Sequence, residues 1–160
     1  MRCLLAAALA LCAAGVAAAQ GTPRTDASHV IVAPPDHIAW GPGPASLPPG
    51  AKAAVLEGNP SEAGPFTMRV VLPDRYRIPP HHHPATEHVT VLKGTFKVGK
   101  GEKFDASAMT PLPTGTFAAL EPGTRHFAEA EGETILQLHG VGPWVLTYVN
   151  PADDPRKQTP

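Results

Sequence analysis

Short apolar runs, spaced about ten residues apart from Phe66 to Val149, are the feature that most constrains the fold of this chain. In the first run, Phe66, Met68 and Val70 alternate with other side chains, and this period of two indicates a strand with one buried face. Glycine-containing turns separate the later runs. These runs cover residues 89–91, 96–98, 117–120, 134–139 and 145–149.

Proline and glycine limit helix length throughout the chain. There are 20 prolines and 15 glycines among the 160 residues, and both residue types are unfavourable inside a helix. The apolar fraction of 42% is nevertheless sufficient to bury a core. We therefore predict an all-β domain, a small antiparallel barrel or sandwich, with a single possible helical turn near residues 104–109.

Residues 1–19 have the pattern of a secretory signal peptide. A positively charged start precedes the apolar stretch Leu4–Val16 and the small residues Ala17–Ala19, so cleavage is expected before Gln20. A membrane anchor is the first alternative, although the apolar run is at the short limit for a bilayer. A lipoprotein signal at Cys12 is a weaker alternative, because the preceding Leu11 is large.

Cleavage at that point would define the mature protein and its location. Both cysteines, Cys3 and Cys12, would be removed, which leaves no disulfide and no thiol in the mature domain. We expect an exported protein, periplasmic or secreted, with no membrane span after signal cleavage. Its core or a bound ligand must then stabilise it.

The chain after the signal divides into three parts. Residues 20–65 form an arm rich in proline and glycine, with short strands predicted at 29–32 and 53–56. Residues 66–150 form the β-barrel, and the polar, proline-rich residues 151–160 are expected to be a mobile tail. The arm has few local contacts, so we expect it to lie against the barrel or to exchange between the subunits of a homodimer.

The charge balance excludes one class of partner. The 13 Lys and Arg residues are matched by 14 Asp and Glu residues, without long runs of one sign. Because nucleic-acid binding depends on cations that neutralise phosphates, we predict no nucleic-acid partner.

Four histidines lie close together between residues 81 and 88. On an extended strand His81, His83 and Glu87 share one face, whereas His82 and His88 point the other way. Two imidazoles and a carboxylate would then converge on one point. Such ligands suit divalent Fe, Mn, Zn, Ni or Cu. A histidine-rich surface loop without a metal is the alternative.

A fourth histidine strengthens the metal hypothesis. His126, in the segment that begins Glu121-Pro122-Gly123, is the candidate that would complete a partial ligand shell and still leave positions for water or substrate. His81-x-His83, followed by Glu87 and Gly94, resembles the first motif of the cupin family. The segment from Gly115 through Glu121-Pro122-Gly123 to His126 resembles the second motif.

The resemblance to cupins implies a fold and a ligand set. The family fold is a double-stranded β-helix, or jelly-roll barrel. The sequence departs from the usual second motif at Glu121, where a proline is usual, and at Ala130, where an asparagine is usual, and neither position ligates the metal. Carried over residue by residue, the resemblance implies one divalent transition metal bound by His81, His83, Glu87 and His126.

Other pocket residues are harder to predict from the sequence. His139, Gln137 and Tyr76 are possible pocket residues, although the Gln137/His139 face is less apolar than the face of its neighbouring leucines. Trp144 is expected to be a packing anchor.

Two functions remain open at this point. The first is a metal-dependent enzyme of dioxygenase, isomerase or lyase type, acting on a small oxygenated molecule in the cell envelope. The alternative is a non-catalytic protein that binds or stores a metal or a small ligand. The complete ligand set favours the enzyme, whereas the lack of a second clear acid or base favours the alternative.

Overall fold

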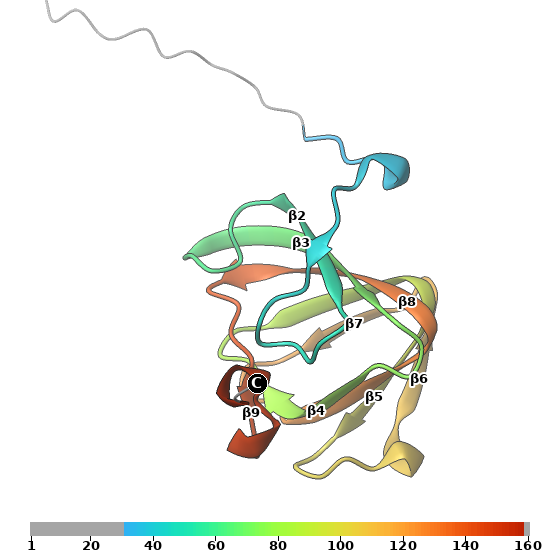
Figure 1. The fold of residues 1–160 in the computed structure, drawn as a ribbon, viewed down its shortest axis with the longest axis vertical. Helices are drawn as coiled ribbons and strands as arrows, with labels where there is room; N and C mark the ends of the chain where they lie inside the picture. The colour runs from blue at the N-terminus through green and yellow to red at the C-terminus, as the bar shows by residue number, and fades with distance from the viewer. Residues whose placement is uncertain (1–30, 159–160) are drawn as a thin grey trace, which may run out of the picture. The chain divides into compact units, whose positions relative to one another are not determined.

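The computed structural model describes residues 31–158, and these form an antiparallel β-structure (Figure 1). The predicted all-β class is therefore confirmed, and the expected helical turn near residues 104–109 is the three-residue η2. The strands are β1 (Gly41–Pro42), β2 (Lys52–Glu57), β3 (Gly64–Leu72), β4 (Arg77–His82), β5 (Glu87–Lys100), β6 (Thr110–Pro113), β7 (Phe117–Leu120), β8 (His126–Gly142) and β9 (Thr147–Tyr148). The short 3₁₀ helices are η1 (Pro35–His37), η2 (Ala106–Ala108), η3 (Pro151–Asp153) and η4 (Pro155–Lys157).

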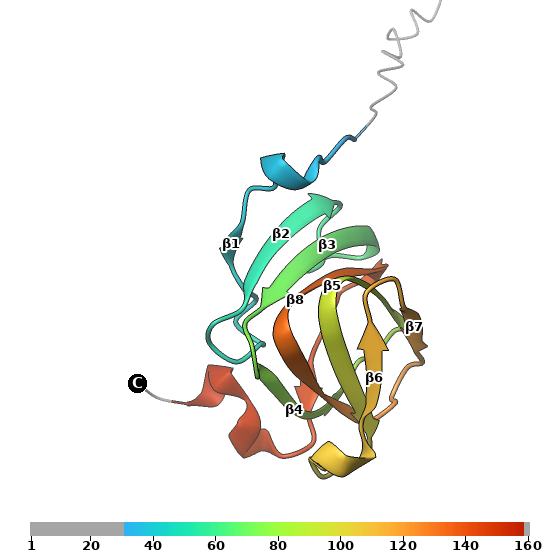
Figure 2. The same cartoon turned by 90° about the vertical axis from the view of Figure 1, so that its right-hand side faces the viewer.

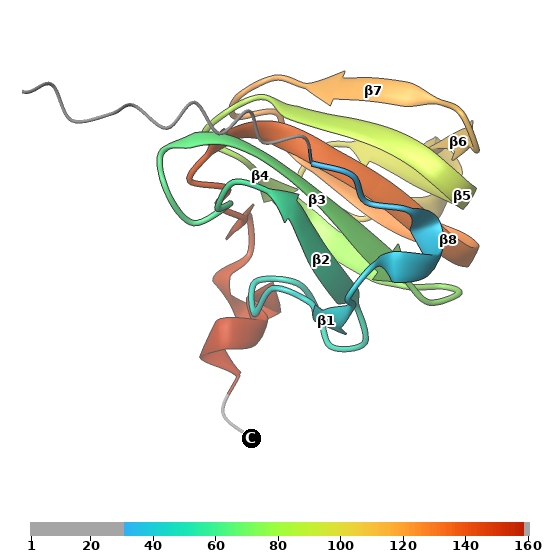
Figure 3. The same cartoon turned by 90° about the horizontal axis from the view of Figure 1, so that it is seen from above.

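The long strands β5 and β8 pair with each other and are shared by both faces of the barrel (Figure 2). Residues 134–142 of β8 and 87–90 of β5 pair with β3 and β7, so this sheet continues outward to β2 and β1 (Figure 3). Residues 126–129 of β8 and 95–98 of β5 instead pair with β4 and β6. This arrangement is a jelly roll, in which two sheets enclose a common interior.

Glycine allows the paired strands to bend from one sheet into the other. Gly94 has a φ of +77°, and the register between β5 and β8 shifts on either side of Lys93. A Cβ atom at Gly94 would lie 2.6 Å from the carbonyl oxygen of Glu133. The residue must therefore be glycine for both conformational and steric reasons.

Replacing this glycine should weaken the fold. Gly94→Ala is expected to lower the free energy of unfolding by about 2–4 kcal/mol, because the positive φ and the close contact both oppose a Cβ atom. Gly115→Ala is the matched control: its φ is +91°, but the added Cβ would meet no atom within 4 Å. We expect it to cost about 1–2 kcal/mol, so equal losses in urea denaturation would contradict the steric argument.

The core lies between the two sheets and follows the predicted alternation. Phe66, Met68, Val70 and Leu72 of β3 are each at most 3% exposed. Each such side chain stabilises the fold by about 1.5–3 kcal/mol. The same core cluster includes Val89, Val91, Phe96, Leu136, Leu138 and Leu146.

Two short strands of the arm, β1 and β2, extend the sheet that contains β3. β2 confirms the strand predicted at 53–56, and β1 pairs with its outer edge. Leu47 enters the core, and the hydroxyls of Tyr76 and Tyr148 donate to the carbonyls of Pro48 and Ser46. Residues 31–32 are not in a strand, and the rest of the strand predicted at 29–32 lies outside the described residues, as does the signal peptide. Exchange of the arm in a homodimer stays a prediction.

The tail contacts the barrel through Arg156. Its guanidinium donates to the Leu146 carbonyl and to the carboxylate of the buried Asp154. Arg156 lies within η4, and Asp154 is the N-cap of this turn. The mobility expected for residues 151–160 stays a prediction, although these contacts oppose it in the segment up to residue 156. No helix within residues 31–158 is long and apolar enough to cross a membrane.

Candidate metal centre

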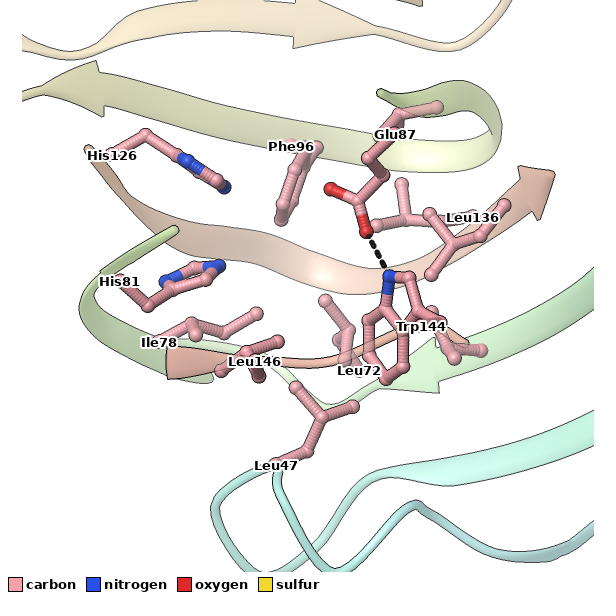
Figure 4. A pocket seen from close by; sticks show the side chains of 13 residues that line it. Leu47, Leu72, Ile78, His81, Glu87, Phe96, His126, Leu136, Trp144 and Leu146 are labelled. Atoms are coloured by element: carbon pink, nitrogen blue, oxygen red, sulfur yellow. Dashed lines mark hydrogen bonds between the residues drawn. The ribbon is translucent and has the colours of Figure 1, made fainter. Parts of the chain in front are cut away.

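Three histidines and a glutamate meet inside the barrel, at the ends of its strands. His81 lies near the end of β4, opposite His126, which is the first residue of β8. His83 directly follows β4, and Glu87 begins β5. Figure 4 shows His81, His126 and Glu87 directed into one cavity from different strands.

The three histidines have the geometry of a metal site. Each offers one ring nitrogen, and these atoms all lie within 4.8 Å of one another. His81, His83 and His126 are 2%, 4% and 3% exposed, so the cluster is shielded from bulk solvent. The structure thus brings together three of the four side chains predicted as ligands.

Hydrogen bonds to the backbone set the orientation of the three rings. Each Nδ1 atom lies 2.8–2.9 Å from a carbonyl oxygen, of Pro79 for His81, of Val145 for His83 and of Thr124 for His126. A carbonyl only accepts, so Nδ1 carries the proton and the lone pair is on Nε2. Metal-binding histidines in proteins are usually oriented in this way.

One of these lone pairs has no partner in the protein. The Nε2 atom of His83 is buried and makes no hydrogen bond within residues 31–158. An orphaned buried polar atom is costly, and a metal ion bound at this point would satisfy it. The residues present therefore fit a divalent metal of borderline softness.

Burial keeps the imidazoles in the neutral form that a metal requires. Desolvation lowers the pKa of His81 well below its usual value, and the neighbouring His126 and His83 lower it further. Desolvation also lowers the pKa of His83 to about 4, against a smaller opposing effect of the Val145 carbonyl. The pKa of His126 is lowered for the same main reason.

Glu87 lies beside the histidines but is hydrogen-bonded to a tryptophan. The indole Nε1 of Trp144 donates to Oε1 of Glu87 at 2.8 Å (Figure 4). The other oxygen, Oε2, lies 3.5 Å from Nε2 of His83. Burial raises the pKa of Glu87, although the hydrogen bond from Trp144 and the nearby His126 oppose the rise. Glu87 is not in the group of ligand atoms that lie within 4.8 Å of one another.

Trp144 is the site residue that sequence reasoning missed. It was expected to be a packing anchor, and its ring does stack on His83, with a centroid distance of 5.5 Å and an angle of 23°. The missed role is its hydrogen bond to Glu87, which joins residues 57 positions apart. Nothing in the residues around Trp144 could have indicated that partner.

The faces of the histidine cluster are as predicted, although one detail of the backbone is not. His81, His83 and Glu87 are buried, whereas His82 and His88 are half-buried. The chain is not one strand here, because β4 ends at His82 and β5 begins only at Glu87. Residues 83–86 form a connection between the two strands, and Glu87 still faces the interior of the barrel after it.

The three possible pocket residues do not reach the metal centre. His139 stacks on His88, at a centroid distance of 4.9 Å, and Gln137 accepts a hydrogen bond from Nε of Arg69. Both lie on the outer face of β8, because Leu136 and Leu138 face the core on the alternating positions. Tyr76 is buried in the core and hydrogen-bonded to the arm, away from the cavity lining.

The cavity beside the histidines is small and mainly apolar. Its volume is about 30 Å³, enough for roughly one or two water-sized groups.

A larger groove of about 680 Å³ lies along β5, β6 and β7. The two share Val89 and Phe96 as part of their walls. Figure 4 shows Phe96 between His126 and Glu87. The other cavity side chains are Leu47, Val70, Leu72, Ile78, Leu136, Leu138, Trp144 and Leu146.

The sequence matches the ChrR cupin-like domain over residues 28–144. No curated protein matches the chain.

Solved structures, one of them named as a cupin, have a similar fold. The polyketide cyclase RemF from Streptomyces resistomycificus has a TM-score of 0.59 at 14% identity, covering 79% of this chain and 90% of its own. A proposed acetylacetone dioxygenase from Methylibium petroleiphilum PM1 has a TM-score of 0.57 at 22% identity, covering 75% and 81%. An RmlC-like cupin from Shewanella frigidimarina NCIMB 400 has a TM-score of 0.52 at 15% identity, covering 68% and 87%. The predicted jelly-roll fold is confirmed.

Proposed function

The chain belongs to the ChrR cupin-like domain family, and we propose that it is a metal-dependent enzyme acting on a small oxygenated molecule. In this proposal His81, His83 and His126 hold one divalent ion of Fe, Mn, Zn, Ni or Cu through their Nε2 atoms. The observation that carries the proposal is the set of three Nδ1 hydrogen bonds to backbone carbonyls, which direct three buried lone pairs at one point.

Three protein ligands leave coordination positions open for chemistry. A bound metal would supply Lewis acidity, or redox activity if it is iron or copper. The residues around it supply the remaining functions. The apolar wall would exclude water, and the Glu87 carboxyl group, which lines the cavity 3.5 Å from His83, would accept or hold a proton there.

The substrate needs more space than the buried cavity offers. The groove along β5, β6 and β7 is within the usual size range of small-molecule sites, and it meets the cavity at Val89 and Phe96. We propose that a mainly apolar substrate lies in this groove and directs an oxygen atom past Phe96. Two structural neighbours are named for enzyme chemistry, on acetylacetone and on polyketides, and this supports the choice of an oxygenated substrate.

A non-catalytic binding protein is the second candidate. The cavity of about 30 Å³ supports it, because so small a space suits a stored metal or a very small ligand as it stands. We also propose a location in the cell envelope, which rests on the signal-like sequence of residues 1–19.

Metal analysis combined with turnover measurements tests these proposals. We expect about one transition-metal ion per chain, and consumption of a β-diketone or a hydroxylated aromatic compound by the metal-loaded protein. His126→Ala should reduce both metal content and turnover at least about tenfold. Bound metal without turnover of any such compound would favour the binding protein, and the absence of bound metal would contradict both the metal-dependent enzyme and the storage of a metal.

A further inference from the structure

Phe96 separates the candidate metal centre from the groove along β5, β6 and β7. Its side chain lies in the wall of the small cavity beside the histidines and also in the wall of the groove, and it is only 6% exposed. Figure 4 shows its ring between His126 and Glu87, inside the barrel. Within residues 31–158, Val89 is the one other residue that lines both spaces. A molecule in the groove therefore reaches the histidines past these two side chains.

The two spaces differ greatly in size. The cavity of about 30 Å³ holds roughly one or two water-sized groups, whereas the groove of about 680 Å³ is large enough for a small organic molecule. A molecule that fills the groove cannot enter the cavity as a whole. It can present only a narrow part of itself to the metal centre, and the position of the Phe96 ring determines how wide that part can be.

The neighbours of Phe96 make this wall apolar. Across the paired strands Phe96 lies opposite Leu112 of β6 and Ala130 of β8. Side chains directly opposite each other on antiparallel strands lie on the same face of the sheet. Ala130 is fully buried, and it stands where the second cupin motif usually has an asparagine. Its methyl group offers Phe96 no polar contact, so the wall selects molecules by size and not by charge.

We propose that Phe96 is the residue that limits substrate size, and that the substrate is an apolar molecule whose metal-directed oxygen has no bulky group beside it. The body of this molecule lies in the groove, against apolar side chains such as Val98 and Leu120. Its oxygen passes Phe96 and reaches the histidine cluster. This inference rests on the proposed function, because it presupposes a metal at His81, His83 and His126.

The test measures how the Co(II)-loaded protein distinguishes imidazole from 2-methylimidazole. Both probes bind a metal through the same kind of nitrogen, and they differ by one methyl group beside that nitrogen. The visible absorption of Co(II) during titration gives the dissociation constant of each probe. The measured quantity is the ratio of the 2-methylimidazole constant to the imidazole constant, because any intrinsic difference between the probes is the same in every variant.

Phe96→Ala should lower this ratio at least about tenfold relative to wild type, since one methyl group against an apolar wall is commonly worth that factor. Phe66→Ala is the matched control, because Phe66 is also a buried phenylalanine, at 3% exposure, and lines neither the cavity nor the groove. It should leave the ratio unchanged, although it removes the same side chain from the core. If either variant does not fold, Phe96→Leu and Phe66→Leu make the same comparison, with an expected decrease of about threefold in Phe96→Leu.

Each alternative result has a separate meaning. A ratio in Phe96→Ala equal to that of wild type would overturn the inference, as would an equal decrease in Phe66→Ala. Exclusion of both probes by wild type, together with binding of both by Phe96→Ala, would support it. Exclusion of both probes by both proteins would overturn it, because Phe96 would then not be what restricts access. Wild-type protein that binds no Co(II) would instead contradict the proposed function on which the inference rests.

Discussion

Adding a divalent transition metal to the apo protein is expected to raise its melting temperature by about 5–10 °C. A ligand that binds only the folded state stabilises it by about 2.7 kcal/mol at 100 times its dissociation constant. For a domain of this size, that free energy corresponds to the stated shift. The metal should bind the folded state much more tightly than the unfolded chain. The three Nε2 atoms come together only when β4, β8 and the segment after β4 are folded.

Two histidine variants separate a built site from a surface cluster. His126→Ala removes a buried ring 4.1 Å from that of His81 and should abolish most of the metal-dependent shift. His82→Ala removes a half-buried neighbour outside the ligand group and should leave the shift nearly intact. Each variant is compared with and without metal by calorimetry, so a loss of basal stability does not affect the conclusion. Equal loss in both variants would favour non-specific binding by the histidine run.

The fold could be predicted largely from local patterns. The alternation in β3 and the runs at 89–91, 96–98, 117–120 and 134–139 identified strands, because a period of two follows directly from strand geometry. The pairing was not available from periodicity. That β5 and β8 each contribute to both sheets depends on the bend at Gly94 and on contacts between distant segments.

The site was partly predictable for the same reason. His81 and His83 share a face through strand geometry, and the cupin-like spacing identified His126 as their partner. His139 and Gln137 were less certain, and parity relative to Leu136 already indicated the outer face on which the structure places them. The hydrogen bond from Trp144 to Glu87 has no local signal, because it depends on how a loop after β8 packs against the start of β5.

Acid should destabilise the apo protein well above the pH at which exposed carboxylates are protonated. Histidine has a pKa near 6.5 in the unfolded chain, whereas burial lowers the folded-state pKa of His83 to about 4 and lowers those of His81 and His126 as well. Between pH 6.5 and about 4 the unfolded state thus binds more protons than the folded state. Stability must therefore fall as the pH decreases through this window, by about 3 kcal/mol from His83 alone.

Glu87 opposes this loss of stability at low pH, but it is a single group, whereas three buried histidines contribute to the loss. Burial raises its folded-state pKa, so its protonation favours the folded state as the pH falls.

Urea denaturation at a series of pH values, with metal removed by a chelator, measures the balance. His83→Gln should flatten the slope by up to about 1.4 kcal/mol per pH unit within the window, because one titrating group is lost. His37→Gln, at an exposed position, should leave the slope unchanged. A slope that is the same in His83→Gln and wild type would mean that His83 is already solvated in the apo protein, and the closed, preformed metal centre would then have to be abandoned.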